Sequence, residues 1–501
     1  MCAASVICRG CPCTESETRQ IYDTDDLVGE AAIQEHIVEI WARLSGVWIE
    51  NPEEYLDNLC LLQDNGSESV VYFDVHNRIV NKLISLKHYT VLRLALDRII
   101  IHNALFPETT LKVLAVSQIY FMNNYKYHIF SPYRVCPLGA HVDHQHGLVT
   151  GFAFDKGVDL WFTPTEDGLV HLKSLTFDGE VCFDVTKPVQ MKEGNWGDYA
   201  RGAKYALKKR FELRRGISGV IKGSLPVGGL SSSAAVLTAY VMALAKANDI
   251  TLSKMEVIKT ASQAEREYIG LTNGILDQAC IVLGEKDSLL FLDTDSEQYR
   301  IIKKNPRMPE FEIAIIFSGL TRSLVSSDYN LRVAECKTAA WNMMAYTGMP
   351  LKSFDKTYLR DIPKETYDLT KEKMPPRFAR RAEHFYSEYK RVRKGVTAWE
   401  TGNLALFGQL SFDSCQSSIK NYECGSEELI AIYNIMRQCE GIYGGRFSGA
   451  GFKGACIALV DPARKEQIRE QITSEYLRMF PEYADTFEIH FCKTDDGARF
   501  V

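Results

Sequence analysis

The segment PVGGLSSSAAV, residues 226–236, is the most informative part of the chain. Gly228 and Gly229 let the backbone come close to a ligand because they carry no side chain. The serines that follow offer hydroxyl donors, and the apolar run AAVLTAYVMALAKAND then predicts a helix. A helix N-terminus directs free N–H groups at the preceding loop, which suits the binding of phosphate. Since the Gly-Lys-Ser/Thr triplet of the Walker pattern is missing, the segment predicts a phosphate loop of another kind.

Two further segments favour this interpretation over its alternative, a Gly/Ser turn that only caps an ordinary helix. Asp277 in NGILDQAC follows Glu265 in QAEREYIGL by twelve residues. A second glycine-rich loop, FSGAGFKGA, spans residues 447–455. Two glycine-rich loops and an acidic pair indicate a phosphate-donor site beside a general base and a magnesium ligand.

Composition limits the class of protein. A chain of 501 residues exceeds the usual size of a single core, so we expect two or three domains. The net charge of −6 and the lack of a long basic run give no reason to expect nucleic-acid binding. No apolar stretch is long enough to cross a bilayer, and the start, MCAASVICRGCPC, is not typical of a signal peptide. We therefore predict a cytoplasmic protein without membrane partners, and favour a monomer.

The 14 cysteines are scattered along the chain, which indicates reduced thiols rather than a small disulfide scaffold. Cys8, Cys11 and Cys13 form a CxxCxC cluster that could hold a metal ion. No second ligand cluster follows at zinc-finger spacing, so we interpret the cluster as part of a flexible tail.

The first part of the chain, residues 1–125, is predicted to be a helical extension of unknown role. Apolar residues recur there with helical spacing, for example from Ile33 to Leu44 and from Ile79 to Ile99. Nothing in this region gathers residues that carry chemistry. We expect it to pack on the main body of the protein.

The rest of the chain predicts an α+β fold of two lobes, at residues 126–310 and 311–501. The runs YHIF, GVDLWF and GEVCFDV predict strands of a sheet, and FEIAIIFSG predicts a buried strand. GIYGGRFSGAGFKGACIALVD predicts a glycine-rich loop that leads into a strand. Helices and strands that alternate without regular βαβ repetition are typical of an α+β enzyme.

Seven segments, which follow one another along the chain in the family's order, resemble the GHMP kinase superfamily in its galactokinase branch. RVCPLGAHVDHQHG resembles the family's sugar motif, PVGGLSSSAA its nucleotide loop, and RFSGAGFKGACIAL its third motif. Weaker likenesses are NWGDYARGA, SSDYNLRVAEC, RRAEHFYSEYKRV and NYECGSEEL. Within the branch, the sugar motif and the segments around GLTNGILDQ and RFSGAGF are more similar to galacturonokinases of the plant type than to galactokinases.

The resemblance implies a two-lobed GHMP kinase fold with ATP and a sugar in the cleft between the lobes. Asp277 would be the general base for the anomeric hydroxyl, Arg134 would offset charge beside it, and Ser233 and Glu265 would hold Mg²⁺. The implied nucleotide-binding residues are Pro226, Gly228, Gly229, Leu230, Ser231, Ser232, Ser233, Ala234, Gly449 and Gly451. The implied sugar-binding residues are Ala140, His141, Asp143, His144, Gly274 and Tyr329.

Ala140 is the main departure from the family pattern, which usually reads Gly-Glu-His-x-Asp-Tyr. In galactokinases that glutamate meets the C6 hydroxyl of the sugar. A uronic acid carries a carboxylate at C6, and a glutamate about 4 Å away would repel it by about 4 kcal/mol at an effective dielectric constant near 20. That is roughly several hundred-fold in binding. Replacing the glutamate would therefore admit a uronate, and His144 or His146 would add a positive partner.

We predict ATP-dependent phosphorylation of D-galacturonate at C1. Galactose stays open as a substrate, as do glucuronate, L-arabinose and L-fucose. Two rivals belong to other classes. One is a galactokinase-like sugar sensor without turnover, and the other is a metal-dependent hydrolase built on the histidines of residues 141–146. The sensor is disfavoured because the catalytic residues and the nucleotide loop are intact, and the hydrolase because it leaves both glycine-rich loops without a role.

Overall fold

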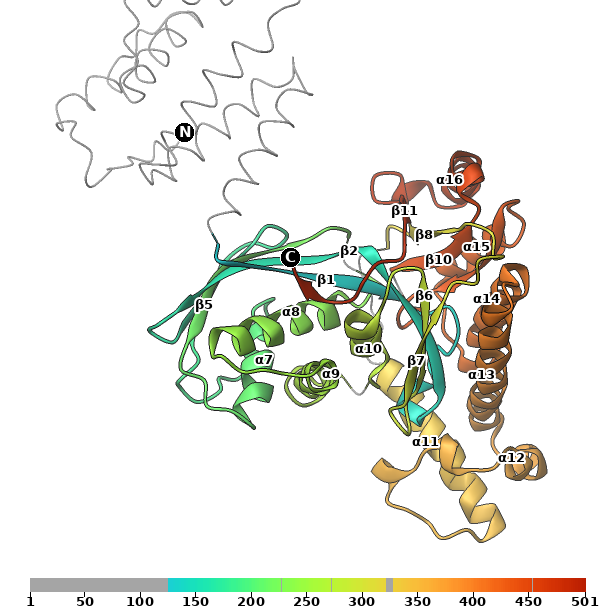
Figure 1. Cartoon of the computed structure of the whole chain (residues 1–501). Coiled ribbons are helices and arrows are strands. Elements are labelled where there is room, and N and C mark those ends of the chain that lie inside the picture. The colour runs from blue at the N-terminus through green and yellow to red at the C-terminus, as the bar shows by residue number, and fades with distance from the viewer. Residues whose placement is uncertain (1–124, 227, 272, 321–327, 453) are drawn as a thin grey trace, which may run out of the picture. The chain divides into compact units, whose positions relative to one another are not determined.

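The computed structural model describes residues 125–226, 228–271, 273–320, 328–452 and 454–501 (Figure 1). The chain separates into two units, Met1–Phe121 and Met122–Val501. The helical extension predicted for residues 1–125 and the CxxCxC cluster lie outside the described residues. All elements below belong to the second unit, in which the predicted division at residue 310 stays a prediction.

The larger sheet is built from the first half of the unit and from the last strand of the chain. Its strands are β1 (Tyr127–Val135), β2 (Leu148–Thr165), β3 (Leu169–Ser174), β4 (Glu180–Asp184), β5 (Gly216–Gly223), β6 (Ser288–Asp293), β7 (Tyr299–Lys303) and β12 (Arg499–Phe500). The strand order is β12-β1-β2-β5-β3-β4, and β6 pairs with both β2 and β7. The C-terminal strand thus returns to the edge of the sheet, beside β1, to which it is antiparallel.

The smaller sheet belongs to the second half of the unit. It has the order β11-β8-β10-β9, and its neighbouring strands are antiparallel. Its strands are β8 (Glu312–Phe317), β9 (Ile442–Phe447), β10 (Ala455–Val460) and β11 (Glu488–Cys492). Both β8 and β10 are buried along their whole length, as expected for apolar runs at the centre of a sheet.

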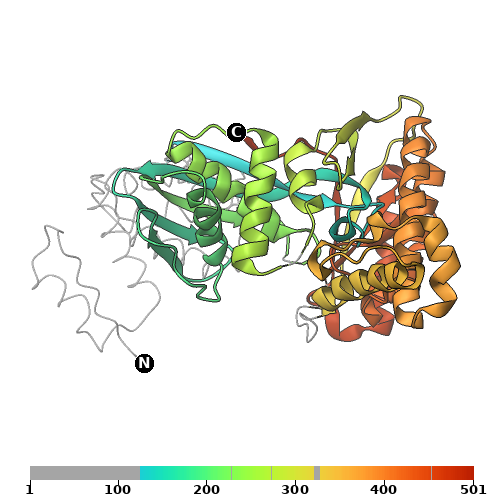
Figure 2. The same ribbon diagram turned by 90° about the horizontal axis from the view of Figure 1, so that it is seen from below.

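The helices form two groups along the chain. The first group is α7 (Asp198–Lys208), α8 (Ser232–Ala247), α9 (Lys254–Gln263), a π-helical turn (Ala264–Ile269) and α10 (Leu276–Leu283). The second group is α11 (Asp328–Thr347), α12 (Lys364–Thr370), α13 (Pro376–Glu400), α14 (Leu404–Ser417), a π-helical turn (Ser418–Tyr422), α15 (Glu427–Met436) and α16 (Lys465–Met479). Figures 1 and 2 show α7 to α10 on one side of the larger sheet and α13 to α16 beside the smaller one.

Six short 3₁₀ turns complete the described part of the unit. They are Asp143–Gln145, Phe354–Lys356, Leu359–Asp361, Lys371–Lys373, Pro462–Arg464 and Pro481–Tyr483. Among the described residues, no helix is long and apolar enough to cross a membrane. Each of the nine cysteines in the described ranges is a free thiol.

The structure confirms the predicted mixture of helix and sheet, with one local error. The runs YHIF, GVDLWF and GEVCFDV lie in β1, β2 and β4, and the helix predicted after the phosphate loop is α8. The error concerns GIYGGRF, which was predicted as loop and forms β9. Its glycines Gly444 and Gly445 are needed in the strand, because a side chain at Gly444 would overlap the backbone of Gly408 in α14.

Candidate active site

The structure brings the predicted base and the predicted arginine into direct contact. Arg134 lies near the end of β1 and Asp277 in the first turn of α10. The Nε of Arg134 donates a hydrogen bond to Oδ1 of Asp277 at 2.7 Å, and its Nη1 donates to the carbonyl of Gly229 at 3.2 Å. Ser231 donates its hydroxyl to the other oxygen of Asp277. Burial opposes the charge on Arg134, but the contact with Asp277 outweighs this effect and raises the pKa of the guanidinium.

The two glycine-rich loops lie against each other, backbone on backbone. The hydroxyl of Ser448 donates to the carbonyl of Gly229 at 2.6 Å. A Cβ atom on Gly449 would lie 3.0 Å from the Cα atom of Gly229, so a side chain would force the loops apart. Gly228, Gly229 and Gly449 all have positive φ angles, which glycine adopts at low cost. Two motifs about 220 residues apart in sequence thus form one surface at the start of α8.

The remaining residues of the predicted nucleotide set take different positions. Ser231, with a φ angle of 55°, precedes α8, which begins at Ser232. The side chains of Leu230 and Ala234 are buried in the core, so they contribute to a nucleotide site through their backbone. Pro226 is exposed. Gly451 does not face Gly229, because a Cβ atom there would meet the sulfur of Cys424 at 3.1 Å.

Glu265 lies in the π-helical turn after α9, and its carboxylate accepts hydrogen bonds from three side chains. Its Oε1 accepts from the hydroxyl of Ser233 at 2.8 Å. Its Oε2 accepts from the amides of Asn273 at 2.8 Å and Gln278 at 2.6 Å. Glu265 is 1% exposed, and burial together with the charge of Asp277 raises the pKa of its carboxyl. A buried carboxylate near a second carboxylate is destabilised by burial and by repulsion, so binding of a cation would stabilise it.

The oxygens around Glu265 fit a magnesium ion. The amide oxygens of Asn273 and Gln278 are buried and have no hydrogen-bond partner among the described residues. The carboxylate of Glu265 and the hydroxyl of Ser233 are oxygen ligands of the kind that a hard cation such as Mg²⁺ prefers, whereas Asn273 and Gln278 direct their NH₂ groups at Glu265. The group has the chemistry of a cation site that is completed by phosphate and water.

The predicted sugar loop follows β1 and has an unusual backbone. Gly139, His141 and His146 have φ angles of 95°, 61° and 62°. Asp143 is 8% exposed and packs against the backbone of Gly274, where a Cβ atom would lie 2.4 Å from its Oδ2. Burial and the charge of Asp277 raise the pKa of Asp143 to about 6. Gly274 is therefore required for the close approach of this carboxyl.

The three histidines of the loop do not converge on a common point. His141 stacks on the ring of Tyr422 with a centroid distance of 4.4 Å. The Nε2 atom of His144 lies 3.1 Å from the hydroxyl of Tyr422. His146 pairs with Asp295 at 3.0 Å on the protein surface. Among the described residues, no group of three or more His, Cys, Asp or Glu side chains is arranged to hold a metal ion.

The idea that His144 supplies a positive charge is wrong. Burial lowers the pKa of His144 to about 3, so its ring is neutral at neutral pH. His146 already has an acidic partner. The burial of His144 could not be deduced from the sequence, in which the loop is simply polar.

Tyr329 and Ala140 complete the predicted sugar set. Tyr329 lies at the start of α11 with its ring edge-on to His144, at a centroid distance of 6.0 Å. Burial and the charge of Asp143 raise the pKa of its phenol. Ala140 is 7% exposed, and its carbonyl lies 3.0 Å from Nε2 of His384 in α13.

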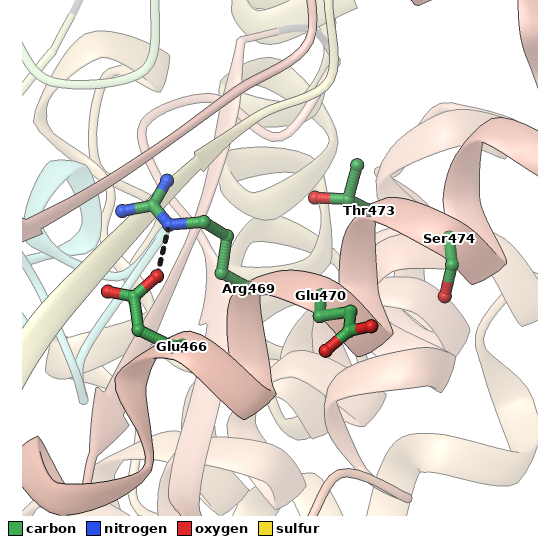
Figure 3. A pocket seen from close by; sticks show the side chains of 5 residues that line it. All are labelled: Glu466, Arg469, Glu470, Thr473 and Ser474. Carbon is green, nitrogen blue, oxygen red and sulfur yellow. Dashed lines mark ion pairs between the residues drawn. The ribbon is translucent and has the colours of Figure 1, made fainter.

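A surface depression elsewhere has no connection with these residues. It is lined by Glu466, Arg469, Glu470, Thr473 and Ser474, all on α16 (Figure 3). Arg469 and Glu466 form an ion pair at 3.4 Å within the helix. A surface made by a single helix offers no converging groups, and we assign it no function.

Several residues around the site were missed by sequence reasoning. They are Asn273, Gln278, His384, Glu388, Tyr422 and Ser448. All lie inside the segments on which the family resemblance rests, so the sequence motifs already include these positions. Their contacts could not be predicted from the sequence, because each is made with a side chain or backbone group that only the fold brings near.

Comparisons with known proteins agree with this fold. The family model for the GHMP kinases N terminal domain matches residues 198–285, and that for the GHMP kinases C terminal domain matches residues 396–478. A galacturonokinase of Arabidopsis thaliana is 40% identical over 397 residues, which are 74% of this chain and 93% of the relative. A galactokinase of Thermotoga maritima is 31% identical over 376 residues, which are 74% of this chain and 99% of the relative.

Solved structures give the same class. The galactokinase of Lactococcus lactis, solved in complex with galactose, matches with a TM-score of 0.70 and 27% identity over 77% of this chain and 99% of that one. The mevalonate kinase of Methanococcus jannaschii, at 17% identity and a TM-score of 0.52, shares the fold. The two glycine-rich loops and the paired acids thus define a kinase of the GHMP fold. The chain belongs to the GHMP kinase family, in the branch that contains galacturonokinase and galactokinase.

The predicted family, fold and kinase class are therefore confirmed. A further family model, for a Serine/Threonine/Tyrosine Kinase found in polyvalent proteins, matches residues 31–124. That region lies outside the described residues.

Proposed function

We propose that this protein transfers the γ-phosphoryl group of ATP to the anomeric hydroxyl of D-galacturonate, giving galacturonate 1-phosphate and ADP. The observation that carries the proposal is the contact of Asp277 with Arg134 and Ser231, beside the paired glycine-rich loops and the sugar loop. A general base, a phosphoryl-charge partner and a phosphate surface are the parts that this reaction requires.

Asp277 accepts the proton of the C1 hydroxyl while the sugar oxygen attacks the γ-phosphorus. The O–P bond to the sugar forms, the bond between the γ-phosphorus and the bridging oxygen breaks, and ADP leaves with that oxygen. An anomeric hydroxyl is more acidic than an ordinary alcohol, so a carboxylate is a sufficient base. Arg134, fixed by its bond to Asp277, offsets the charge on the transferred group.

The backbone of residues 228–233 binds the phosphates of ATP in this proposal, and Ser233 and Glu265 hold Mg²⁺. The direct contact between the hydroxyl of Ser233 and Oε1 of Glu265 supports that assignment. When bound, Mg²⁺ neutralises phosphate charge. The protein itself contributes alignment of the reacting groups. The three side chains that donate hydrogen bonds to Glu265 hold its carboxylate in one orientation.

The choice of galacturonate rests on Ala140 and on the relatives. No carboxylate side chain stands at position 140, where it would repel the C6 carboxylate of a uronate. The relative with 40% identity is named galacturonokinase. Galactose is the second candidate, since several relatives are named galactokinase and the structure with a TM-score of 0.70 was solved with galactose. Glucuronate, L-arabinose and L-fucose remain open, and so does a sugar sensor without turnover.

An assay of ATP consumption with galacturonate, glucuronate, galactose, L-arabinose and L-fucose tests the proposal. We expect galacturonate to give the highest kcat/KM. A strong preference for galactose would refute the substrate argument, and no turnover of any sugar would favour the sensor. A cytoplasmic location and a monomeric state stay predictions.

A further inference from the structure

The sugar loop is held by side chains from a distant part of the chain. The N–H group of Gly139 donates to Oε1 of Glu388 at 2.7 Å. The carbonyl of the next residue, Ala140, lies 3.0 Å from Nε2 of His384. His384 and Glu388 are four residues apart on α13, so they share one face of that helix. Two adjacent backbone groups of the loop are therefore anchored to one helical face.

The hydrogen bonds of His384 define which of its ring nitrogens carries the proton. A carbonyl only accepts hydrogen bonds, so Nε2 must be the donor to Ala140. The other nitrogen, Nδ1, lies 2.9 Å from the hydroxyl of Ser417 and accepts from it. His384 is 1% exposed, and burial lowers its pKa to about 4, so the neutral ring with a proton on Nε2 is the form present.

Glu388 is a completely buried carboxylate with a full set of donors. It accepts from Nε of Arg391 and from the hydroxyl of Ser414, both at 2.6 Å, and Arg446 lies 4.0 Å away. Burial alone would raise the pKa of Glu388, but the neighbouring positive charges outweigh this and lower it to about 2. The carboxylate is thus ionised at neutral pH and accepts the hydrogen bond from Gly139.

The sugar loop needs such anchors because its backbone conformation is unfavourable around Ala140. Positive φ angles at Gly139 and His141 flank Ala140, and the left-handed conformation is unfavourable for a histidine. Such a conformation persists only where the surroundings impose it. The anchored peptide groups immediately precede His141 and Asp143, so a shift there would displace both predicted sugar contacts.

We propose that His384 and Glu388 are positioning residues that hold the sugar loop in its binding conformation without touching the sugar. This inference rests on the proposed function, in which the loop binds the sugar. For His384 it predicts a selective effect: losing this anchor weakens sugar binding and leaves ATP binding unchanged, because the described hydrogen bonds of the His384 ring go to Ala140 and Ser417 and not to the loops at Gly228–Ser233 or Ser448–Gly451.

The test compares three variants of α13 in the full-length protein. His384→Phe removes the donor to Ala140, whereas His384→Gln keeps an N–H group that can reach the carbonyl. Tyr386→Phe is the control from the same helix: the hydroxyl of Tyr386 donates to the carbonyls of Ile362 at 2.9 Å and Leu359 at 3.4 Å, and none of these hydrogen bonds is made with residues 136–147 directly. We expect His384→Phe to raise the KM for the sugar about tenfold, with the KM for ATP changing less than about twofold. His384→Gln should restore most of the loss, and Tyr386→Phe should change neither KM.

Hydrogen–deuterium exchange of the sugar-free protein gives a readout independent of catalysis. His384→Phe should increase exchange in residues 136–147, and Tyr386→Phe should not. Unchanged exchange and an unchanged sugar KM would overturn the positioning role, as would equal increases in both KM values. Should His384→Phe fail to fold, Ser417→Ala takes its place, with an expected sugar KM increase of about threefold. A parent protein that phosphorylates no sugar contradicts the proposed function, while the exchange data still decide the positioning role.

Discussion

The phosphate side and the sugar side of the site are stabilised in different ways. On the phosphate side the predicted functional side chains contact one another: Arg134 and Ser231 bind Asp277, and Ser233 binds Glu265. On the sugar side, the loop of residues 136–147 is held by groups more than 240 positions away in sequence, on α13 and the turn that follows α14. In the proposed function, catalysis therefore depends on mutual contacts between functional side chains, and sugar recognition depends on a loop conformation imposed by distant residues.

Among the variants proposed here, loss of the Asp277 carboxylate should lower activity the most. We expect Asp277→Ala to lower kcat by about 10²- to 10⁴-fold, the range typical for loss of a general base. The measurement is kcat at saturating ATP and sugar. Asp277→Asn, which keeps the shape and loses the basicity, is the control and should be nearly as inactive. Undiminished phosphorylation by Asp277→Ala would remove Asp277 from the role of base.

The sugar side should respond selectively to a carboxylate at position 140. We expect Ala140→Glu to lower kcat/KM for galacturonate by roughly several hundred-fold, because the new charge repels the C6 carboxylate. Turnover of galactose should fall much less. The informative quantity is the ratio of kcat/KM for the two sugars, with Ala140→Gln as the uncharged control. An unchanged ratio would mean that position 140 does not face C6.

A variant of the proposed cation site should have a smaller effect. Ser233→Ala removes a hydroxyl oxygen and its hydrogen bond to Glu265, so we expect the Mg²⁺ concentration for half-maximal activity to rise by about 10- to 100-fold. Ser262→Ala is a matched control, because the hydroxyl of Ser262 is buried and has no partner among the described residues. Equal Mg²⁺ requirements for the two variants would argue against a ligand role for Ser233.

The mildest prediction concerns pH and Asp143, whose pKa is raised to about 6 by burial and by the charge of Asp277. The folded protein holds this proton more tightly than the unfolded chain, so this group favours folding less as pH rises from about 4 to about 6. The ionised carboxylate that accepts sugar hydroxyls forms only as pH passes about 6. We expect the sugar KM to rise up to about tenfold from pH 7 to pH 5. Asp143→Asn should flatten this dependence, and an unaltered pH profile in that variant would assign it to another group.

The difference between the phosphate side and the sugar side also explains which functional residues could be predicted from the sequence. The phosphate loop, Glu265 and Asp277 were predicted because each lies in a short motif whose residue types already indicate the chemistry. The strand β9 was missed because Gly444 and Gly445 look like loop residues until the packing of α14 against them is known. The anchors His384 and Glu388 and the neutral state of His144 were missed because burial and long-range contacts determine them. Ala140 was informative from sequence alone, since its effect is the absence of a charge.

The most direct test of the central claim is ³¹P NMR of the product formed from ATP and galacturonate by the full-length protein. The proposed reaction predicts a new sugar phosphate resonance that couples to the anomeric proton, together with an equal amount of ADP. A phosphate on another carbon would contradict the role of Asp277 at the C1 hydroxyl. Formation of ADP without any sugar phosphate, or a product from galactose alone, would contradict the proposed function.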